Sequence, residues 1–164
     1  MSNTPEIPED IKTEERFQPG RVLTVSAGHL THDIYTSFLA PFLPLIMAKL
    51  GISVMLAGSL SLYMRLPSAF SPMLGVISDR VNLRPIFCLT PAISAAAMCS
   101  IGLAPGYGVL ALIMVTAGAS AAMFHVVGPV IVVRVAANRV GRGMGWFMTA
   151  GEMARTVGPV TAVG

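Results

Sequence analysis

Charged residues are scarce in this chain of 164 residues: they make up 12% of it, while hydrophobic residues make up 54%. Soluble domains carry about 25% charged residues. A fold of this size leaves much of its surface in contact with water, so a soluble protein could not hide so many apolar side chains. The scarcity of charge therefore excludes an ordinary soluble enzyme, a disordered chain and a nucleic-acid-binding module.

Cysteine is rare as well, and the N-terminus lacks the pattern of a signal peptide. Cys88 and Cys99 lie in one apolar stretch without metal-ligand spacing to any histidine, so we interpret them as small apolar side chains. Residues 1–20 contain several acidic residues and have no basic start followed by an apolar core. We expect residues 1–20 to form a short, flexible tail.

Long apolar runs fill residues 21–164. A helix rises about 1.5 Å per residue, so about 20 residues cross the roughly 30 Å of hydrocarbon in a bilayer. Because backbone polar groups cannot remain unpaired in lipid, each run is predicted to be a helix. The five predicted spans are 22–48, 54–77, 85–103, 107–133 and 144–164. The sequence thus predicts an all-α polytopic membrane protein.

Basic residues gather in alternate links between these spans. Eight of them lie before the first span or in the second and fourth links: Lys12, Arg16, Arg21, Arg80, Arg84, Arg134, Arg139 and Arg142. The first link has only Lys49, and the third has no basic residue. Because basic links stay on the cytoplasmic side, the N-terminus is predicted to be cytoplasmic.

Ionisable side chains also fall inside the predicted spans. They are His29, His32, Asp33, Arg65, His125, Glu152 and Arg155. An ionised group at the bilayer centre costs about 2.5–3.5 kcal/mol on insertion scales, so such residues are candidate functional groups by default. Only the span 85–103 has none, and we expect it to lie at the lipid-facing periphery.

His29, His32 and Asp33 are spaced to share one face of a helix. This polar stripe either braces neighbouring helices by hydrogen bonding or lines a polar translocation pathway. A metal site that also uses His125 is conceivable. The stretch is not a His-Glu-x-x-His motif, however, and we find no serine or cysteine nucleophile motif. We therefore predict no metal, no cofactor and no enzyme.

The other intramembrane residues allow more than one interpretation. Glu152 and Arg155 are three residues apart and could neutralise each other. Arg65 could be the partner of Asp33 across a helix interface. His125 could have only a packing or hydrogen-bonding role.

The second link contains the most specific motif, Gly75-Val-Ile-Ser-Asp79-Arg80-Val-Asn82-Leu-Arg84. It resembles the Gly-x-x-x-Asp-Arg-x-Gly-Arg-Lys signature between helices two and three of the major facilitator superfamily. Gly75, Asp79, Arg80 and Arg84 match, and Asn82 replaces a glycine but can also adopt a left-handed turn. In that family the motif acts as a cytoplasmic gate latch, which makes the four matching residues candidate gate residues.

Three further stretches resemble parts of the same family. Gly151, Gly158 and Pro159 are similar to the helix-five motif of its proton-driven exporters. Two other stretches resemble helices one and four of the fosmidomycin-resistance type of drug exporter: His29-Leu-Thr-His32-Asp33 and Gly118-Ala-Ser-Ala-Ala-Met-Phe124-His125. His32 and Ser120 depart from that pattern, where the subgroup has asparagine and glycine.

The resemblance implies two six-helix halves that work by alternating access. The chain would then be the N-terminal part of such a transporter, truncated within or at the end of helix five. It implies proton-coupled efflux of a small molecule across a bacterial inner membrane, with Asp33 and its histidines as the first candidates for proton coupling or substrate contact. The missing C-terminal half or a partner membrane chain would complete the substrate site. The alternative is a non-transporting membrane fragment or interaction subunit without a complete site.

Overall fold

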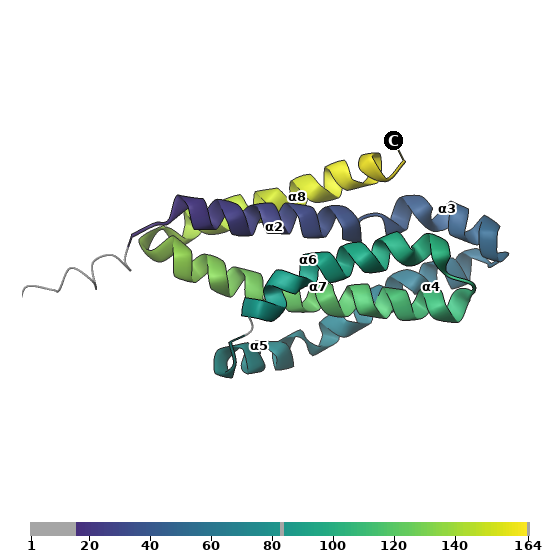
Figure 1. The fold of residues 1–164 in the computed structure, drawn as a ribbon, viewed down its shortest axis with the longest axis horizontal. Coiled ribbons are helices and arrows are strands. Elements are labelled where there is room, and N and C mark those ends of the chain that lie inside the picture. The colour runs from purple at the N-terminus through teal and green to yellow at the C-terminus, as the bar shows by residue number, and fades with distance from the viewer. Residues whose placement is uncertain (1–15, 83, 164) are drawn as a thin grey trace, which may run out of the picture.

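The computed structural model describes residues 16–82 and 84–163, apart from the side chains of Asp79 and Val163. Most of the expected tail, residues 1–15, lies outside the described residues. All regular secondary structure in the described part of the chain is helical (Figure 1). The prediction of an all-α protein is thus confirmed.

The first predicted span forms two helices, α2 (Pro19–Thr36) and α3 (Leu39–Leu50), rather than one. The break lies at Ser37 and Phe38. Pro41, in the first turn of α3, has no N–H with which to continue the hydrogen-bond ladder back to residue 37. Gly51 ends α3 in the left-handed conformation, with φ of 62°.

The second predicted span is also broken. It forms α4 (Val54–Arg65), the 3₁₀ turn η1 (Leu66–Phe70) and α5 (Ser71–Arg80). Pro67 and Pro72 cause the break, because a proline can start a helical segment but cannot continue one without losing a hydrogen bond.

The remaining elements are longer. They are α6 (Arg84–Cys99), the 3₁₀ turn η2 (Ser100–Leu103), α7 (Tyr107–Ala136), the 3₁₀ turn η3 (Ala137–Arg139) and α8 (Val140–Val163). Ala137 has a positive φ of 47°, and the chain reverses there, so that α8 runs back along the bundle (Figure 1).

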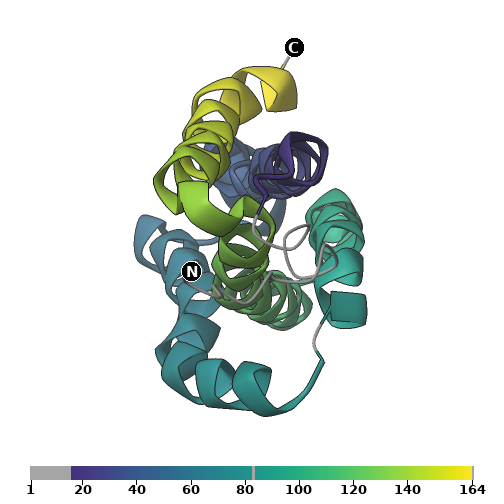
Figure 2. The same ribbon diagram turned by 90° about the vertical axis from the view of Figure 1, so that its left-hand side faces the viewer.

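Helix α7 is the centre of the bundle and packs against α2, α4, α5, α6 and α8 (Figure 2). Helix α8 lies along α2. Two groups of buried apolar side chains fill the interior. One group includes Leu60, Met98, Leu110 and Met114, and the other consists of Phe87, Phe124, Val127, Val132 and Phe147.

Three helical runs in the described chain are long and apolar enough to cross a membrane: Pro19–Leu50, Arg84–Leu103 and Tyr107–Ala162. The last run has 56 residues and contains the reversal at Ala137. The run from α4 to α5 is not among them, so the count of five spans stays a prediction. The basic residues Arg21, Arg84 and Arg134 do meet around one cavity at the end of the bundle where α2 begins.

Candidate functional site

Asp33 lies near the end of α2 and is only 2% exposed. Four cationic or potentially cationic groups surround its carboxylate. His32 Nδ1 is 3.0 Å and His125 Nε2 is 3.4 Å from Oδ1, while His29 Nε2 is 3.4 Å and Arg155 Nε is 3.5 Å from Oδ2. The structure therefore brings α2, α7 and α8 together at one buried carboxylate.

His29 is held by α8. Its Nδ1 lies 2.8 Å from the backbone carbonyl oxygen of Phe147, and its ring stacks on the Phe147 ring with centroids 4.0 Å apart. Because a carbonyl oxygen can only accept, Nδ1 carries the hydrogen. Among the residues that the structure describes, the other ring nitrogen, Nε2, has no hydrogen-bond partner, although it is buried and faces Asp33 Oδ2 at 3.4 Å.

His32 is held by α6 and α7. Its ring stacks on Phe124 with centroids 4.4 Å apart, and its Nε2 lies 3.0 Å from Ser94 Oγ. Ser94 donates to Ser120 Oγ at 2.9 Å, and Ser120 donates to the backbone carbonyl of Thr90 at 2.8 Å. These hydroxyl groups form a buried polar row from the site into the bundle.

The sequence pattern did not point to this row. The span 85–103 was expected to lie at the periphery because it has no charge, and α6 does expose Ile86, Leu89 and Ile93. On its other side, however, α6 buries Thr90 and Ser94. The available signal was the spacing of these two hydroxyl residues four positions apart in an apolar helix.

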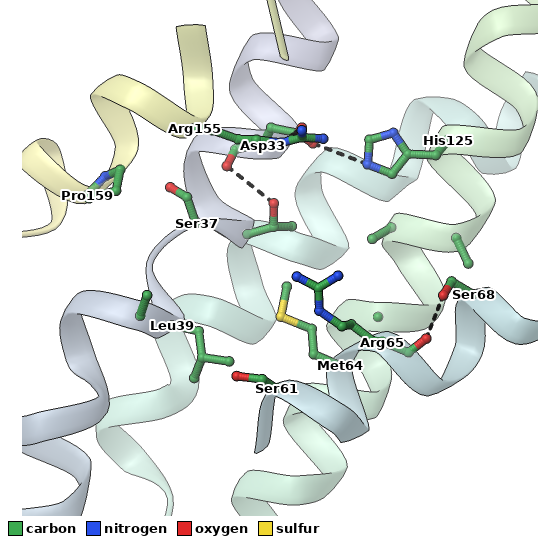
Figure 3. Close-up of a pocket in the computed structure, with 15 residues that line it drawn as sticks. Asp33, Ser37, Leu39, Ser61, Met64, Arg65, Ser68, His125, Arg155 and Pro159 are labelled. Carbon is green, nitrogen blue, oxygen red and sulfur yellow. Dashed lines mark hydrogen bonds and ion pairs between the residues drawn. The ribbon is translucent and has the colours of Figure 1, made fainter. Parts of the chain in front are cut away.

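A cavity of about 490 Å³ opens beside Asp33 (Figure 3). Asp33, Arg65, His125 and Arg155 all line it, together with the hydroxyl groups of Thr36, Ser37, Ser61 and Ser68. Arg65 reaches the cavity from α4, but the arginine in contact with Asp33 is Arg155. The cavity therefore has a second guanidinium group on its wall besides the one at the carboxylate.

Glu152 and Arg155 pair with each other at 2.9 Å between Oε1 and Nη1. Their side chains are 70% and 57% exposed. Arg155 bridges Glu152 and Asp33, so the self-neutralising pair considered from the sequence exists and also extends to the buried carboxylate.

The small residues of the helix-five motif allow α8 to approach α2 closely. A Cβ at Gly151 would lie 2.5 Å from His29 Cε1, and a Cβ at Gly158 would meet Ser37 Oγ and the backbone oxygen of Ile34. Pro159 lines the cavity. These positions hold α8 against the histidine side of the site.

The candidate gate residues lie away from Asp33, at the link between α5 and α6. Arg80 and Arg84 line a cavity of about 330 Å³ with Arg134. A Cβ at Gly75 would meet nothing within 4 Å, and the side chain of Asp79 lies outside the described residues. Asn82 has no positive φ; its Oδ1 instead accepts a hydrogen bond from the Arg84 backbone N–H at 3.2 Å.

Three groups at the site have the geometry to share a cation. Ligand atoms of His29, Asp33 and His125 lie within 4.8 Å of one another. The Arg155 guanidinium already stands at the Asp33 carboxylate, and its charge opposes a second cation there. We therefore assign no metal ligands among these residues.

An all-helical bundle with long apolar helices and an ionisable cluster at membrane depth is the architecture of an integral membrane protein with a polar interior. Comparison with known proteins agrees. The model of the Major Facilitator Superfamily matches residues 25–163, so the chain belongs to that family, as its motifs predicted.

One relative is the fosmidomycin resistance protein of Escherichia coli (strain K12). It is 21% identical over 151 residues, which cover 92% of this chain and 37% of the relative. The chain thus spans little more than a third of that protein's length. No solved structure gave a significant match.

Proposed function

We propose that the chain is the N-terminal part of a secondary active transporter that exports a small molecule in exchange for protons by alternating access. The observation that carries the proposal is Asp33, a carboxylate 2% exposed at membrane depth, in contact with three histidines and an arginine beside a cavity. Ionisable groups in this setting are typical of proton relays in transporters.

The setting gives Asp33 two ways to be neutralised. An isolated buried carboxylate is costly in a low-dielectric interior, so it must either bind a proton or keep a cation beside it. The Arg155 side chain is 57% exposed, whereas His29 and His32 are buried and stack on aromatic rings. Antiport requires that proton and substrate weaken each other's binding. A substrate that stabilises the ionised form of Asp33 would release the proton, and its departure would allow Asp33 to bind one again.

The cavity supports a small-molecule substrate. It combines polar hydroxyl groups and Arg65 with apolar side chains, as binding sites for small ligands do. The only guide to the chemistry of the cargo is the name of the relative, which is a resistance protein for fosmidomycin. We propose efflux of such a drug across the bacterial inner membrane, with the N-terminus in the cytoplasm. We also propose that a C-terminal half or a partner membrane chain completes the substrate site.

The proposal makes Asp33→Asn the first variant to test. The native polypeptide that contains this sequence is reconstituted in liposomes with a pH-sensitive dye inside, and fosmidomycin is added outside. We expect proton flux on addition of the drug in the wild type, and flux at the level of empty liposomes in Asp33→Asn. The amide keeps the shape of the side chain but cannot carry a negative charge or bind a proton at neutral pH.

Thr31→Val is the matched control. Thr31 lies on the same helix, and its hydroxyl donates to the backbone carbonyl of Ala27 in that helix. It should leave proton flux unchanged. Drug-dependent flux that survives in Asp33→Asn would refute the role of Asp33 in coupling.

A further inference from the structure

The hydroxyl row that starts at His32 has only one possible direction. The Thr90 carbonyl can only accept, so Ser120 donates its one hydroxyl hydrogen to it. Ser94 must then donate to Ser120 Oγ. Once this hydrogen is engaged, Ser94 Oγ can only accept from His32 Nε2, 3.0 Å away. The row therefore requires a hydrogen on His32 Nε2.

The hydrogen on Nε2 determines whether His32 Nδ1, which faces Asp33, carries a hydrogen or a lone pair. A neutral imidazole carries a hydrogen on only one of its two nitrogens, so Nδ1 would direct a lone pair at Asp33 Oδ1. The two atoms are 3.0 Å apart, which is a hydrogen-bond distance. A hydrogen bond at this position needs one further proton, either on Asp33 as a carboxylic acid or on His32 as an imidazolium.

No other group that faces Asp33 lies closer to its carboxylate than His32 does. His29 donates from Nδ1 to a backbone carbonyl of α8, so its neutral Nε2 also directs a lone pair at Asp33. His125 Nε2 and Arg155 Nε lie 3.4 Å and 3.5 Å from the carboxylate, farther than His32. Glu152 offsets the charge of Arg155 from the exposed side.

Burial keeps the row in this direction. His32 and Ser94 are 0% exposed and Ser120 is 5% exposed, so water cannot easily replace any member as donor or acceptor. The row also joins three helices, because His32 lies on α2, Ser94 on α6 and Ser120 on α7.

We infer that Ser94 and Ser120 are positioning residues that keep a hydrogen on His32 Nε2, so that His32 and Asp33 hold one proton between them in this conformation. This inference deepens the proposed function and rests on it for its role in transport: the conformation described here is then the proton-loaded state of the coupling site.

Nitrogen NMR of histidine-labelled protein in lipid nanodiscs tests the inference directly. The chain has three histidines, and the His32 signal is the one lost in His32→Gln. In the wild type at neutral pH, His32 is expected to carry a hydrogen on Nε2. In Ser120→Ala, the Ser94 hydroxyl is free to donate to Nε2, so His32 is expected to change to the neutral form with its hydrogen on Nδ1.

Two further variants complete the test. Ser94→Ala removes the acceptor itself and is expected to give the same change as Ser120→Ala. Ser100→Ala removes a hydroxyl that donates to the backbone carbonyl of Ala96, four residues earlier, and should leave His32 unchanged. The His29 signal, which depends on its bond to Phe147, reports in every variant whether the fold is kept.

A wild-type His32 without a hydrogen on Nε2 would overturn the inference, as would an unchanged His32 in both serine variants when the His29 signal is preserved. Because the measurement needs neither substrate nor flux, its outcome is independent of the transport assay. Drug-dependent flux that persists in Asp33→Asn would count against the proposed function alone.

Discussion

Gly151 gives the sharpest prediction for the packing of the site. A Cβ at this position would lie 2.5 Å from His29 Cε1 and 2.6 Å from Nε2, about 1 Å inside the usual contact distance. The His29 ring cannot retreat freely, because it stacks on Phe147 and donates to the Phe147 carbonyl. Gly151→Ala must therefore displace α8, His29 or both.

The expected cost follows from three contributions. Overpacking of a tight interface costs about 1–3 kcal/mol, and loss of the hydrogen bond from His29 to Phe147 costs about 1 kcal/mol. Replacing a helical glycine by alanine returns about 1 kcal/mol. We therefore expect Gly151→Ala to lower the free energy of unfolding by about 1–3 kcal/mol.

The assay is unfolding of the chain in mixed micelles with increasing dodecyl sulfate. Trp146 is the only tryptophan of the chain, and it lies on α8 in an edge contact with Phe17, so its fluorescence follows the docking of that helix. Gly145→Ala is the matched control, since a Cβ there would meet nothing within 4 Å and should stabilise the protein by up to about 1 kcal/mol. If Gly151→Ala is as stable as Gly145→Ala, the close approach of α8 to His29 is wrong.

The membrane orientation and a surface tether can be tested as well. With both native cysteines replaced by alanine, a membrane-impermeant maleimide added outside the cell is expected to label Ser53→Cys and not Asn138→Cys, because basic links remain cytoplasmic; the reverse pattern would place the N-terminus outside. Lys49→Met removes the ammonium group that donates to the Gly102 carbonyl at 2.5 Å and should lower the free energy of unfolding by about 1 kcal/mol. An unchanged free energy of unfolding in the same fluorescence assay would mean that the bond from Lys49 to Gly102 does not stabilise the protein.

The sequence alone predicted the family and showed that ionisable side chains lie within apolar helices. Apolar runs of membrane length predicted helices, and the motif around Asp79 and Arg80 led to the family that the comparison confirms. The helical spacing of His29 and Asp33 predicted that they share one helix face, and their nearest side-chain atoms are 3.4 Å apart.

The contacts between helices could not be predicted from the sequence. The sequence suggested Arg65 as a partner for Asp33, and only the packing of α8 on α2 shows that Arg155 contacts it instead. Ser94 escaped notice because hydroxyl residues are common in membrane helices and bond mostly within their own helix. Their role appears only when three helices are placed together.

Proline explains the main difference within single spans. A smooth apolar run from 54 to 77 predicted one helix, yet Pro67 and Pro72 divide it into α4, η1 and α5. Membrane helices often tolerate proline, so the sequence alone could not say whether it would bend this helix or interrupt it.

The hydroxyl row has a mechanical consequence. It joins α2, α6 and α7 through side chains that are almost fully buried, so water cannot easily replace a broken bond. If α6 slid past α2, His32 Nε2 would lose its acceptor, Ser94 Oγ. If the three helices tilted together as a rigid body, every hydrogen bond of the row would remain. A motion that keeps these hydrogen bonds must therefore bend the protein outside α2, α6 and α7. The interrupted segment from α4 to α5, which contains two prolines, is such a place.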